Sequence, residues 1–205
     1  MSTNRQDWSG GYASIFKCLG ASNHTDGERE QNDYYATDPM AIDALASMIE
    51  LPHKIWEPSC GEGHLAKRLI ELGKDVVSTD LIDRGYGQGG VDFFATDKMP
   101  DNCDCIITNP PYKYATEYVL HALDLLPVGG MLALFLKTTF LEDKSRREKI
   151  FNYAPPKWLL QFSSRVMCAK NGDFEQVVKN GGSAAAYAWF VWVKGDYNNT
   201  TIKWI

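Results

Sequence analysis

Four consecutive residues, Asn109-Pro110-Pro111-Tyr112, combine an amide, two prolines and an aromatic ring directly after the apolar run CIIT. Proline fixes the backbone φ angle and has no N–H donor, so this corner presents hydrogen-bond acceptors in a preset arrangement. A planar amino group, as in adenine or a carboxamide, is a poor nucleophile because its lone pair is delocalised. If the Asn109 side-chain oxygen and the Pro110 carbonyl accept its two hydrogens, the lone pair is freed. The tetrapeptide therefore predicts activation of a planar amine, with the Tyr112 ring as a stacking face for a base.

A second chemical signal is the glycine-rich turn in "IWEPSCGEGHLA". Gly61, Gly63 and Ala66 fit the G-x-G-x-x-G/A pattern of a strand-to-helix nucleotide turn, in which glycines allow close approach of a ligand. Asp80 follows nineteen residues after Gly61, at the end of the next predicted strand. A carboxylate in that place can accept hydrogen bonds from the ribose hydroxyls of a nucleoside. The pattern predicts a nucleoside-containing cofactor, but dehydrogenases also carry it.

Glu57 distinguishes the two kinds of cofactor. It lies four residues before Gly61, at the predicted strand end. A carboxylate there repels the pyrophosphate of NAD and attracts an ammonium group. S-adenosylmethionine (SAM) has an amino acid end, a sulfonium and a ribose, and it has no phosphate. Glu57 therefore favours SAM over NAD. Asp92 and Phe93, after a third, weak predicted strand, are placed to contact the adenine of such a cofactor.

Taken together, the segments EPSCGEGHLA, STDL, VDFF and NPPY resemble the class I SAM-dependent aminomethyltransferases, and most of all the DNA adenine-N6 methyltransferases of phages and bacteria. The resemblance covers roughly residues 34–193. It implies transfer of a methyl group from SAM to the N6 amine of a flipped-out adenine in DNA, without a metal. It also implies a Rossmann-like α/β fold, with a seven-stranded, mostly parallel sheet, helices on both faces and an antiparallel last strand.

The resemblance also implies a set of site residues. The proline corner supplies the catalytic residues Asn109, Pro110, Pro111 and Tyr112. In the cofactor site, the methionyl part is expected at Glu57, Gly61 and Gly63, the ribose at Asp80, and the adenine at Asp92 with Phe93. The segment YYATDP resembles the part of the family that closes over the methionyl end. The complete predicted cofactor-binding set is Thr37, Asp38, Glu57, Ser59, Gly61, Gly63, Asp80, Leu81, Asp92 and Phe93.

One departure from the family concerns target recognition. Sequence-specific members carry a sizeable recognition region, whereas only forty-nine residues separate Gly61 from Pro110 here. The remaining material is a short basic insert at about residues 142–182. From Lys137 to Lys179 there are nine Lys or Arg against five Asp or Glu, a local charge of +4 in a chain of net charge −5. This insert predicts loose target specificity or dependence on a partner.

The elements that would position these residues alternate between strand and helix. Apolar runs at 54–58, 75–81, 104–108, 131–137, 157–162, 183–193 and 201–205 predict strands. Helical patterns accompany the glycine turn, at 63–73, and the proline corner, at 112–126. Two further helical patterns lie at 39–51 and 143–151. Such alternation predicts a mostly parallel sheet whose ligands bind at the carboxyl ends of its strands. We expect a polar N-terminal arm at 1–33 and a methyltransferase domain at 34–205.

Composition limits the other classes of function. The negative net charge argues against nonspecific coating of nucleic acid, and five cysteines without a framework spacing predict reduced thiols and no metal site. The sequence shows no signal peptide and no apolar run long enough to span a membrane, so a cytoplasmic protein is expected. The oligomeric state is left open. The alternatives are methylation of RNA adenine or of a protein glutamine, a noncatalytic SAM-binding subunit, and a NAD oxidoreductase.

Overall fold

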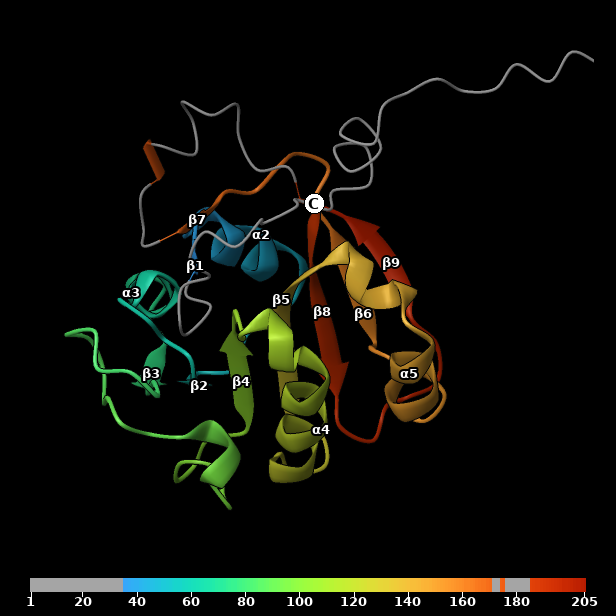
Figure 1. Cartoon of the computed structure of the whole chain (residues 1–205), viewed down its shortest axis with the longest axis horizontal. Coiled ribbons are helices and arrows are strands. Elements are labelled where there is room, and N and C mark those ends of the chain that lie inside the picture. The colour runs from blue at the N-terminus through green and yellow to red at the C-terminus, as the bar shows by residue number, and fades with distance from the viewer. Residues whose placement is uncertain (1–34, 171–173, 176–184) are drawn as a thin grey trace, which may run out of the picture.

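The computed structural model of the chain describes residues 35–170, 174–175 and 185–205. The predicted arm at 1–33 lies outside these residues, as does part of the predicted basic insert. Seven strands form one mixed sheet in the order β3-β2-β4-β5-β8-β6-β9 (Figure 1). They are β2 (Lys54–Glu57), β3 (Asp75–Ser78), β4 (Cys105–Thr108), β5 (Met131–Lys137), β6 (Trp158–Gln161), β8 (Tyr187–Val193) and β9 (Thr201–Trp204).

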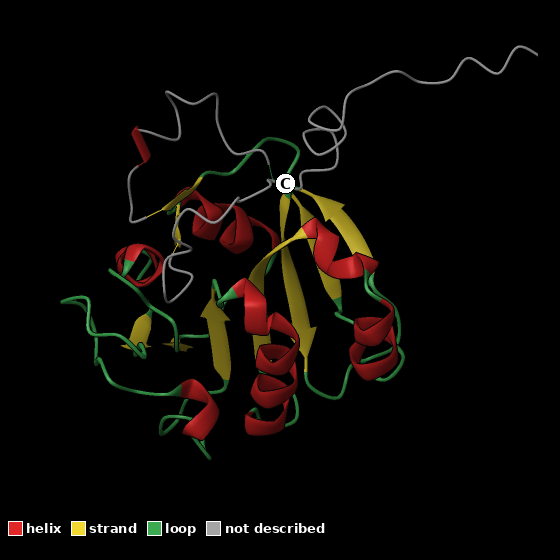
Figure 2. Cartoon of the chain, viewed as in Figure 1, coloured by secondary structure: helices red, strands yellow, loops and turns green. Residues whose placement is uncertain are grey.

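Helices cover both faces of this sheet (Figure 2). α2 (Met40–Met48) and α3 (His64–Glu71) pack on one face, whereas α4 (Ala115–Leu125) and the π-helical segment η4 (Arg147–Phe151) pack on the other. The predicted helix at 143–151 consists of the short α5 (Lys144–Arg146) followed by η4. The predicted α/β fold with a mostly parallel sheet is therefore confirmed. In the described part of the chain, no helix is both long and apolar enough to cross a membrane.

The central strands are buried on both sides, which explains their continuous apolar sequences. In β5, Leu132, Leu134 and Leu136 belong to the core under α4, while Ala133 and Phe135 belong to the core under α2 and α3. The antiparallel neighbour β8 pairs with the whole of β5, from Met131 opposite Val193 to Lys137 opposite Tyr187. This paired centre of the sheet fixes the carboxyl ends of β4 and β5. The proline corner begins directly after β4.

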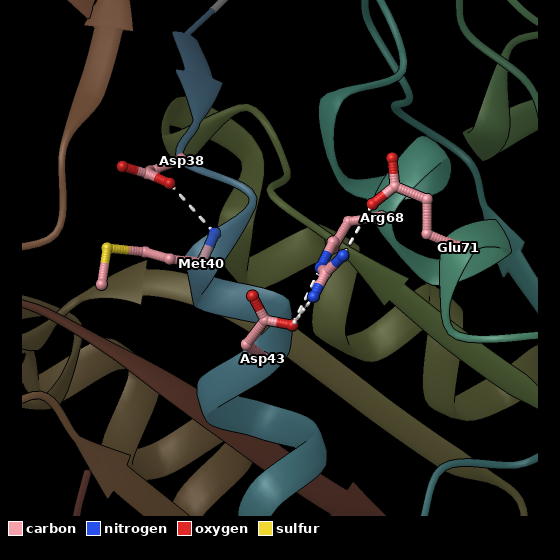
Figure 3. Close-up of polar contacts among 5 residues, drawn as sticks. All are labelled: Asp38, Met40, Asp43, Arg68 and Glu71. Carbon is pink, nitrogen blue, oxygen red and sulfur yellow. Dashed lines mark hydrogen bonds and ion pairs between the residues drawn. The ribbon is translucent and has the colours of Figure 1, made fainter.

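The two helices on the first face are also joined by charged side chains, as Figure 3 shows. Arg68 of α3 forms an ion pair with Asp43 of α2 at 2.7 Å and another with Glu71 at 2.7 Å. The Asp38 carboxylate accepts a hydrogen bond from the backbone N–H of Met40 at 3.0 Å and so caps the start of α2. These exposed contacts add little stability individually, but they hold the start of α2 beside α3.

Two expectations about the sheet are wrong. No strand forms between the described β3 and β4; the segment before Asp92 makes only an isolated bridge, Thr79 with Gln88, and leads into the 3-10 helix η1 (Phe93–Ala95). Gly85, Gly87 and Gly90 in this segment have positive φ angles, which break an extended strand. The seventh strand of the sheet is β9, which falls in the predicted run 201–205 and lies at the opposite edge, parallel to β6. The antiparallel strand is consequently β8, inside the sheet, and not the last strand of the chain.

A small second sheet was not predicted. β1 (Tyr35–Thr37) pairs antiparallel with β7 (Cys168–Lys170), with Thr37 opposite Cys168. The backbone N–H of Asp38 extends this pairing to the carbonyl of Met167 at 3.1 Å. The pairing joins the segment ahead of α2 to the predicted basic insert. It is this small sheet that brings residues 35–37 to the proline corner, as the candidate site shows.

Candidate active site

A cavity of about 980 Å³ lies at the carboxyl ends of β2, β3, β4 and β5. From β2 the chain continues to β3 on one side, and β4 lies on the other side. Open α/β sheets bind ligands at such a switch point, and small-molecule sites typically measure about 300–1,000 Å³. Ten of the predicted site residues line the cavity: Thr37, Glu57, Ser59, Asp80, Leu81, Asp92, Phe93, Asn109, Pro111 and Tyr112. The other four, Asp38, Gly61, Gly63 and Pro110, are described but are not part of its lining.

The glycine turn has the backbone that its sequence requires. Gly61 and Gly63 both have left-handed φ angles, +54° and +79°. The N–H of Gly63 donates to the carbonyl of Cys60 at 2.8 Å, and the helix α3 begins at the next residue. A Cβ atom on Gly63 would lie 2.3 Å from the Tyr86 ring, so the tyrosine packs directly on this glycine. Glycine at position 63 thus satisfies two constraints, one of backbone angle and one of space.

Replacement of Gly63 by alanine is expected to lower the free energy of unfolding by about 2–4 kcal/mol, because it strains the backbone and displaces the Tyr86 ring. Gly73 is a matched control: its φ angle is +78°, and no other atom lies within 4 Å of a Cβ built there. Gly73→Ala should therefore lose only about 1–2 kcal/mol, from backbone strain alone. Urea unfolding of both variants measures the difference. Equal losses would mean that the Tyr86 contact contributes nothing.

Asp80 ties the glycine turn to the end of β3. Its Oδ2 accepts a hydrogen bond from the Gly61 N–H at 2.8 Å, and its Oδ1 accepts one from the Ile82 N–H at 2.9 Å. A carboxylate oxygen can accept two hydrogen bonds. Each Asp80 oxygen therefore keeps capacity for a second hydrogen bond, as the predicted ribose contact requires.

Glu57 is a buried carboxyl group in the cavity wall. Its residue is only 2% exposed, and its Oε2 has no hydrogen-bond partner within the described residues. Burial raises the pKa of Glu57 well above its ordinary value of 4.5, and the nearby Asp80 raises it further, while a hydrogen bond with the backbone of Ala66 opposes the shift. Such a group is costly to ionise unless a cation pairs with it. The arrangement suits a positively charged ligand.

Aromatic side chains form the wall beside Asp92. Asp92 caps η1 by accepting from the Phe94 N–H at 2.9 Å. The buried Phe93 ring stacks on Tyr118 of α4, with the ring centroids 4.1 Å apart. The Tyr118 hydroxyl lies 2.9 Å from the Ser59 hydroxyl. Phe94, which is 42% exposed, also lines the cavity. This wall is an apolar surface of the kind that a planar base requires.

Asn109 stands at the end of β4 with its amide orientation fixed. Its Nδ2 donates to the Thr37 hydroxyl at 2.8 Å and to the Tyr35 carbonyl at 3.1 Å. Its Oδ1 is buried, and none of the described residues donates a hydrogen bond to it. Asn109 lines the cavity, and within the described residues its oxygen is an acceptor that receives no hydrogen bond. A buried acceptor of this kind needs a partner, and a ligand N–H group is a suitable one.

The rest of the proline corner is rigid. The Pro111 carbonyl accepts from the Tyr114 N–H at 2.9 Å, which starts the short 3-10 helix η2 (Tyr112–Tyr114). Pro110 is buried beside the cavity, and the role of its carbonyl stays a prediction. The Tyr112 hydroxyl lies 3.8 Å from the Cys168 sulfur. Burial raises the pKa of Tyr112 well above its usual range, so this hydroxyl is neutral.

The cavity lining also includes residues that were not predicted as site residues, among them Lys137 and Tyr118. Lys137 ends β5, and its Nζ lies 5.1 Å from the centroid of the Tyr112 ring. Tyr118 is fully buried in α4 and reaches the cavity between Ser59 and Phe93. Neither belongs to a motif. The position of Lys137 at the carboxyl end of a predicted strand was the one signal that could have indicated it.

The described part of the basic insert contributes no residue to the cavity lining. Arg146 donates to the Phe140 carbonyl at 2.6 Å and to the Thr139 carbonyl at 3.3 Å, so it holds the turn before α5. Lys144 lies 3.9 Å from Glu148 on the same exposed surface. In Figure 1, α5 lies to the right of α4, whereas β2 and β3, whose ends line the cavity, lie to the left. Across the described residues, no group of three or more His, Cys, Asp or Glu could hold a metal ion.

Comparison with known proteins places this geometry in a fold family. No family model matches the chain, and no curated protein does. Solved structures do match. A Pyrococcus horikoshii protein assigned as an RNA methyltransferase has a TM-score of 0.58 at 12% identity, covering 88% of this chain and 97% of its own. A Listeria monocytogenes protein assigned as a class I SAM-dependent methyltransferase has a TM-score of 0.53 at 13% identity, covering 94% and 71%.

A third similar structure is a modification subunit assigned to a type I restriction enzyme from Vibrio vulnificus. Its TM-score is 0.56 at 12% identity, with 95% of this chain covered but only 50% of the subunit. The chain therefore spans half of that protein. At these identities, the likeness concerns the fold. The chain has the fold of the class I SAM-dependent methyltransferases.

Proposed function

We propose that this protein is a SAM-dependent methyltransferase that methylates the N6 amine of adenine in DNA. The observation that carries the proposal is the Asn109 side chain. Its amide nitrogen is held by two protein acceptors. The residue lines the cavity, and its Oδ1 is buried without a donor from the described residues. An acceptor fixed in this way matches the N–H group of a planar amine, because it becomes satisfied only when the amine is bound.

The cavity has residues suited to each part of SAM. Glu57, with its unpartnered Oε2, would pair with the ammonium group of the methionyl end. Asp80 would accept from the ribose hydroxyls, and the wall of Asp92 and Phe93 would contact the adenine. Gly61 and Gly63 would let the backbone approach the ligand closely. When bound, SAM supplies an electrophilic methyl group on a sulfonium.

The residues of the proline corner would prepare the amine. The Asn109 Oδ1 and the Pro110 carbonyl would accept its two hydrogens, which favours a tetrahedral nitrogen with a free lone pair. These dipoles also stabilise the positive charge that develops on the nitrogen during attack. Tyr112 would hold the ring of the base, with its hydroxyl fixed near Cys168. No general base is required beforehand, because the proton can leave to solvent after the nitrogen is methylated.

Binding of SAM should depend on pH through Glu57. In the free protein the raised pKa keeps this carboxyl protonated above its ordinary range, whereas pairing with an ammonium requires the carboxylate. Binding then releases a proton, so affinity should rise with pH, by up to about tenfold per unit, and level off above the raised pKa. Calorimetry at several pH values measures this. A flat profile would contradict the assigned partner of Glu57.

The choice of DNA rests on support of two kinds. The segments NPPY, EPSCGEGHLA, STDL and VDFF resemble those of DNA adenine methyltransferases, and a restriction-modification subunit shares the fold. The cavity mouth also carries Phe94, Tyr114 and Lys113, aromatic and basic residues that suit an extruded base and its backbone. The described part of the chain offers little further surface for reading a sequence, so we expect loose specificity.

The proposal is tested by offering the protein labelled SAM with DNA, RNA and protein substrates in parallel. Label in DNA, and much less in the other two, is the expected result. Label confined to RNA or to a protein glutamine would keep the amine chemistry and overturn the choice of substrate. Absence of transfer to all three, together with tight SAM binding, would favour a noncatalytic SAM-binding subunit.

A further inference from the structure

The Asn109 amide must present its oxygen to the substrate amine, because only the oxygen of an amide can accept a hydrogen bond from an N–H group. Rotation of the amide by half a turn would exchange Oδ1 and Nδ2 with little change of shape, and would point a donor at the substrate's own N–H groups. Something must therefore select the orientation. Nδ2 faces two oxygens, the Tyr35 carbonyl and the Thr37 hydroxyl. In the reversed orientation, the amide oxygen would face the Tyr35 carbonyl, which cannot donate.

Thr37 is itself held in place by β7. It is 2% exposed, and it lies opposite Cys168 in the small sheet. Its hydroxyl oxygen is 3.9 Å from the Cys168 sulfur. Because this oxygen accepts from Asn109, its own hydrogen can be directed to that sulfur. Burial raises the pKa of Cys168 to about 11, so the sulfur is a neutral thiol and serves as a weak hydrogen-bonding group.

The same sulfur contacts the other end of the proline corner. The Tyr112 hydroxyl lies 3.8 Å from it. Polar contacts therefore run from Asn109 through Thr37 and Cys168 to Tyr112, and join the two side chains of the corner that are assigned to the substrate. The linking groups come from two short strands, β1 and β7, and the facing residues Thr37 and Cys168 are 131 positions apart in the sequence.

We propose that Thr37 is a positioning residue. Its hydroxyl holds the Asn109 amide in the orientation that the Tyr35 carbonyl selects, with the amide oxygen toward the substrate amine. Thr37 is one of the predicted cofactor-binding residues, and its contact with Asn109 supports a role in positioning the amide. This proposal rests on the proposed function, because positioning of the amide affects catalysis only if Asn109 binds the substrate amine. The orientation of the amide can be measured without any reaction.

The kinetic test compares Thr37→Val, which keeps the shape and removes the acceptor, with Thr37→Ser, which keeps the hydroxyl. At saturating SAM, Thr37→Val should lower kcat by about 10- to 100-fold, because the amide keeps only one of the two acceptors that hold its nitrogen and becomes less precisely placed. Its SAM dissociation constant should stay within a few-fold of the wild-type value. Thr37→Ser should restore most of kcat. If Thr37→Val weakened SAM binding and left kcat unchanged, Thr37 would be a cofactor contact and the proposal would be wrong.

A second measurement follows the Asn109 side-chain NH₂ signals by NMR in the free protein, assigned by their loss in Asn109→Asp. In the wild type, both hydrogens should exchange slowly with solvent. Thr37→Val should shift these signals and speed exchange, whereas Thr37→Ser should not. Thr79→Val is the control, since it removes a similarly buried hydroxyl that accepts from Trp56 at 2.9 Å and does not contact Asn109.

The two measurements separate the failure of this inference from that of the proposed function. Unchanged Asn109 signals in Thr37→Val would overturn the positioning role, whether or not methyl transfer occurs. If the wild type methylated no substrate, the proposed function would fail, and the NMR result alone would decide the role of Thr37. Should Thr37→Val not fold, Thr37→Ala removes the same hydroxyl with less bulk and is read in the same way.

Discussion

Replacement of Asn109 by alanine is expected to abolish methyl transfer while SAM affinity stays within a few-fold of the wild-type value. The side chain supplies the fixed acceptor for the substrate amine, and loss of one preorganised group of this kind costs about 10²–10³-fold in kcat. Asn109→Ala also leaves the Thr37 hydroxyl without its donor. The proline corner therefore becomes less ordered, in addition to losing the acceptor for the substrate amine. Single-turnover assays at saturating SAM measure the rate, and calorimetry measures the affinity.

Asn152→Ala is the matched control, because Asn152 is exposed just after η4 and is not part of the cavity lining. It should methylate at the wild-type rate. Thermal unfolding of Asn109→Ala should show a folded protein, which separates lost chemistry from lost structure. Methylation by Asn109→Ala at the wild-type rate would contradict the role given to the proline corner.

Replacement of Glu57 by glutamine is expected to weaken SAM binding on the order of 100-fold, since it removes one partner of a desolvated charge pair. The same change should stabilise the free protein. The raised pKa of Glu57 means that its stabilising contribution is present at low pH and is lost as pH rises through the folded-state pKa. Glutamine does not ionise, so the variant should keep that stability at neutral pH.

Glu117→Gln is the control for Glu57→Gln, because Glu117 also lines the cavity but is exposed to solvent. It removes the same charge and should change SAM affinity much less. Calorimetry and urea unfolding at pH values on both sides of neutrality give the two quantities. If Glu57→Gln bound SAM as tightly as the wild type, the ammonium contact would be wrong.

The parts of the site that the sequence predicted are those set by local chemistry. Gly61 and Gly63 need left-handed angles, and they have them. Asp80 and Asn109 follow strands whose apolar runs are unmistakable, and the carboxyl ends of parallel strands meet at one edge of the sheet. The cavity therefore gathers most of the predicted residues, although their binding roles await the experiments above.

The parts that were missed depend on contacts between distant segments. β1 and β7 have three residues each, too few for any periodicity, and pair across more than 130 positions. Tyr118 reaches the cavity only because α4 packs against the Phe93 ring. The weak strand predicted before Asp92 does not form for a local reason. The glycines in that segment have positive φ angles, which an extended strand does not allow.

Methylation of adenine in DNA is tested most directly by incubating plasmid DNA with the protein and SAM, digesting the DNA to nucleosides, and measuring methylated nucleosides by mass spectrometry. We expect N6-methyladenine in the wild-type reaction and none above background with Asn109→Ala. Sequencing of the same DNA should show loosely specified sites. Methylation of cytosine alone, or N6-methyladenine formed equally by Asn109→Ala, would contradict the account.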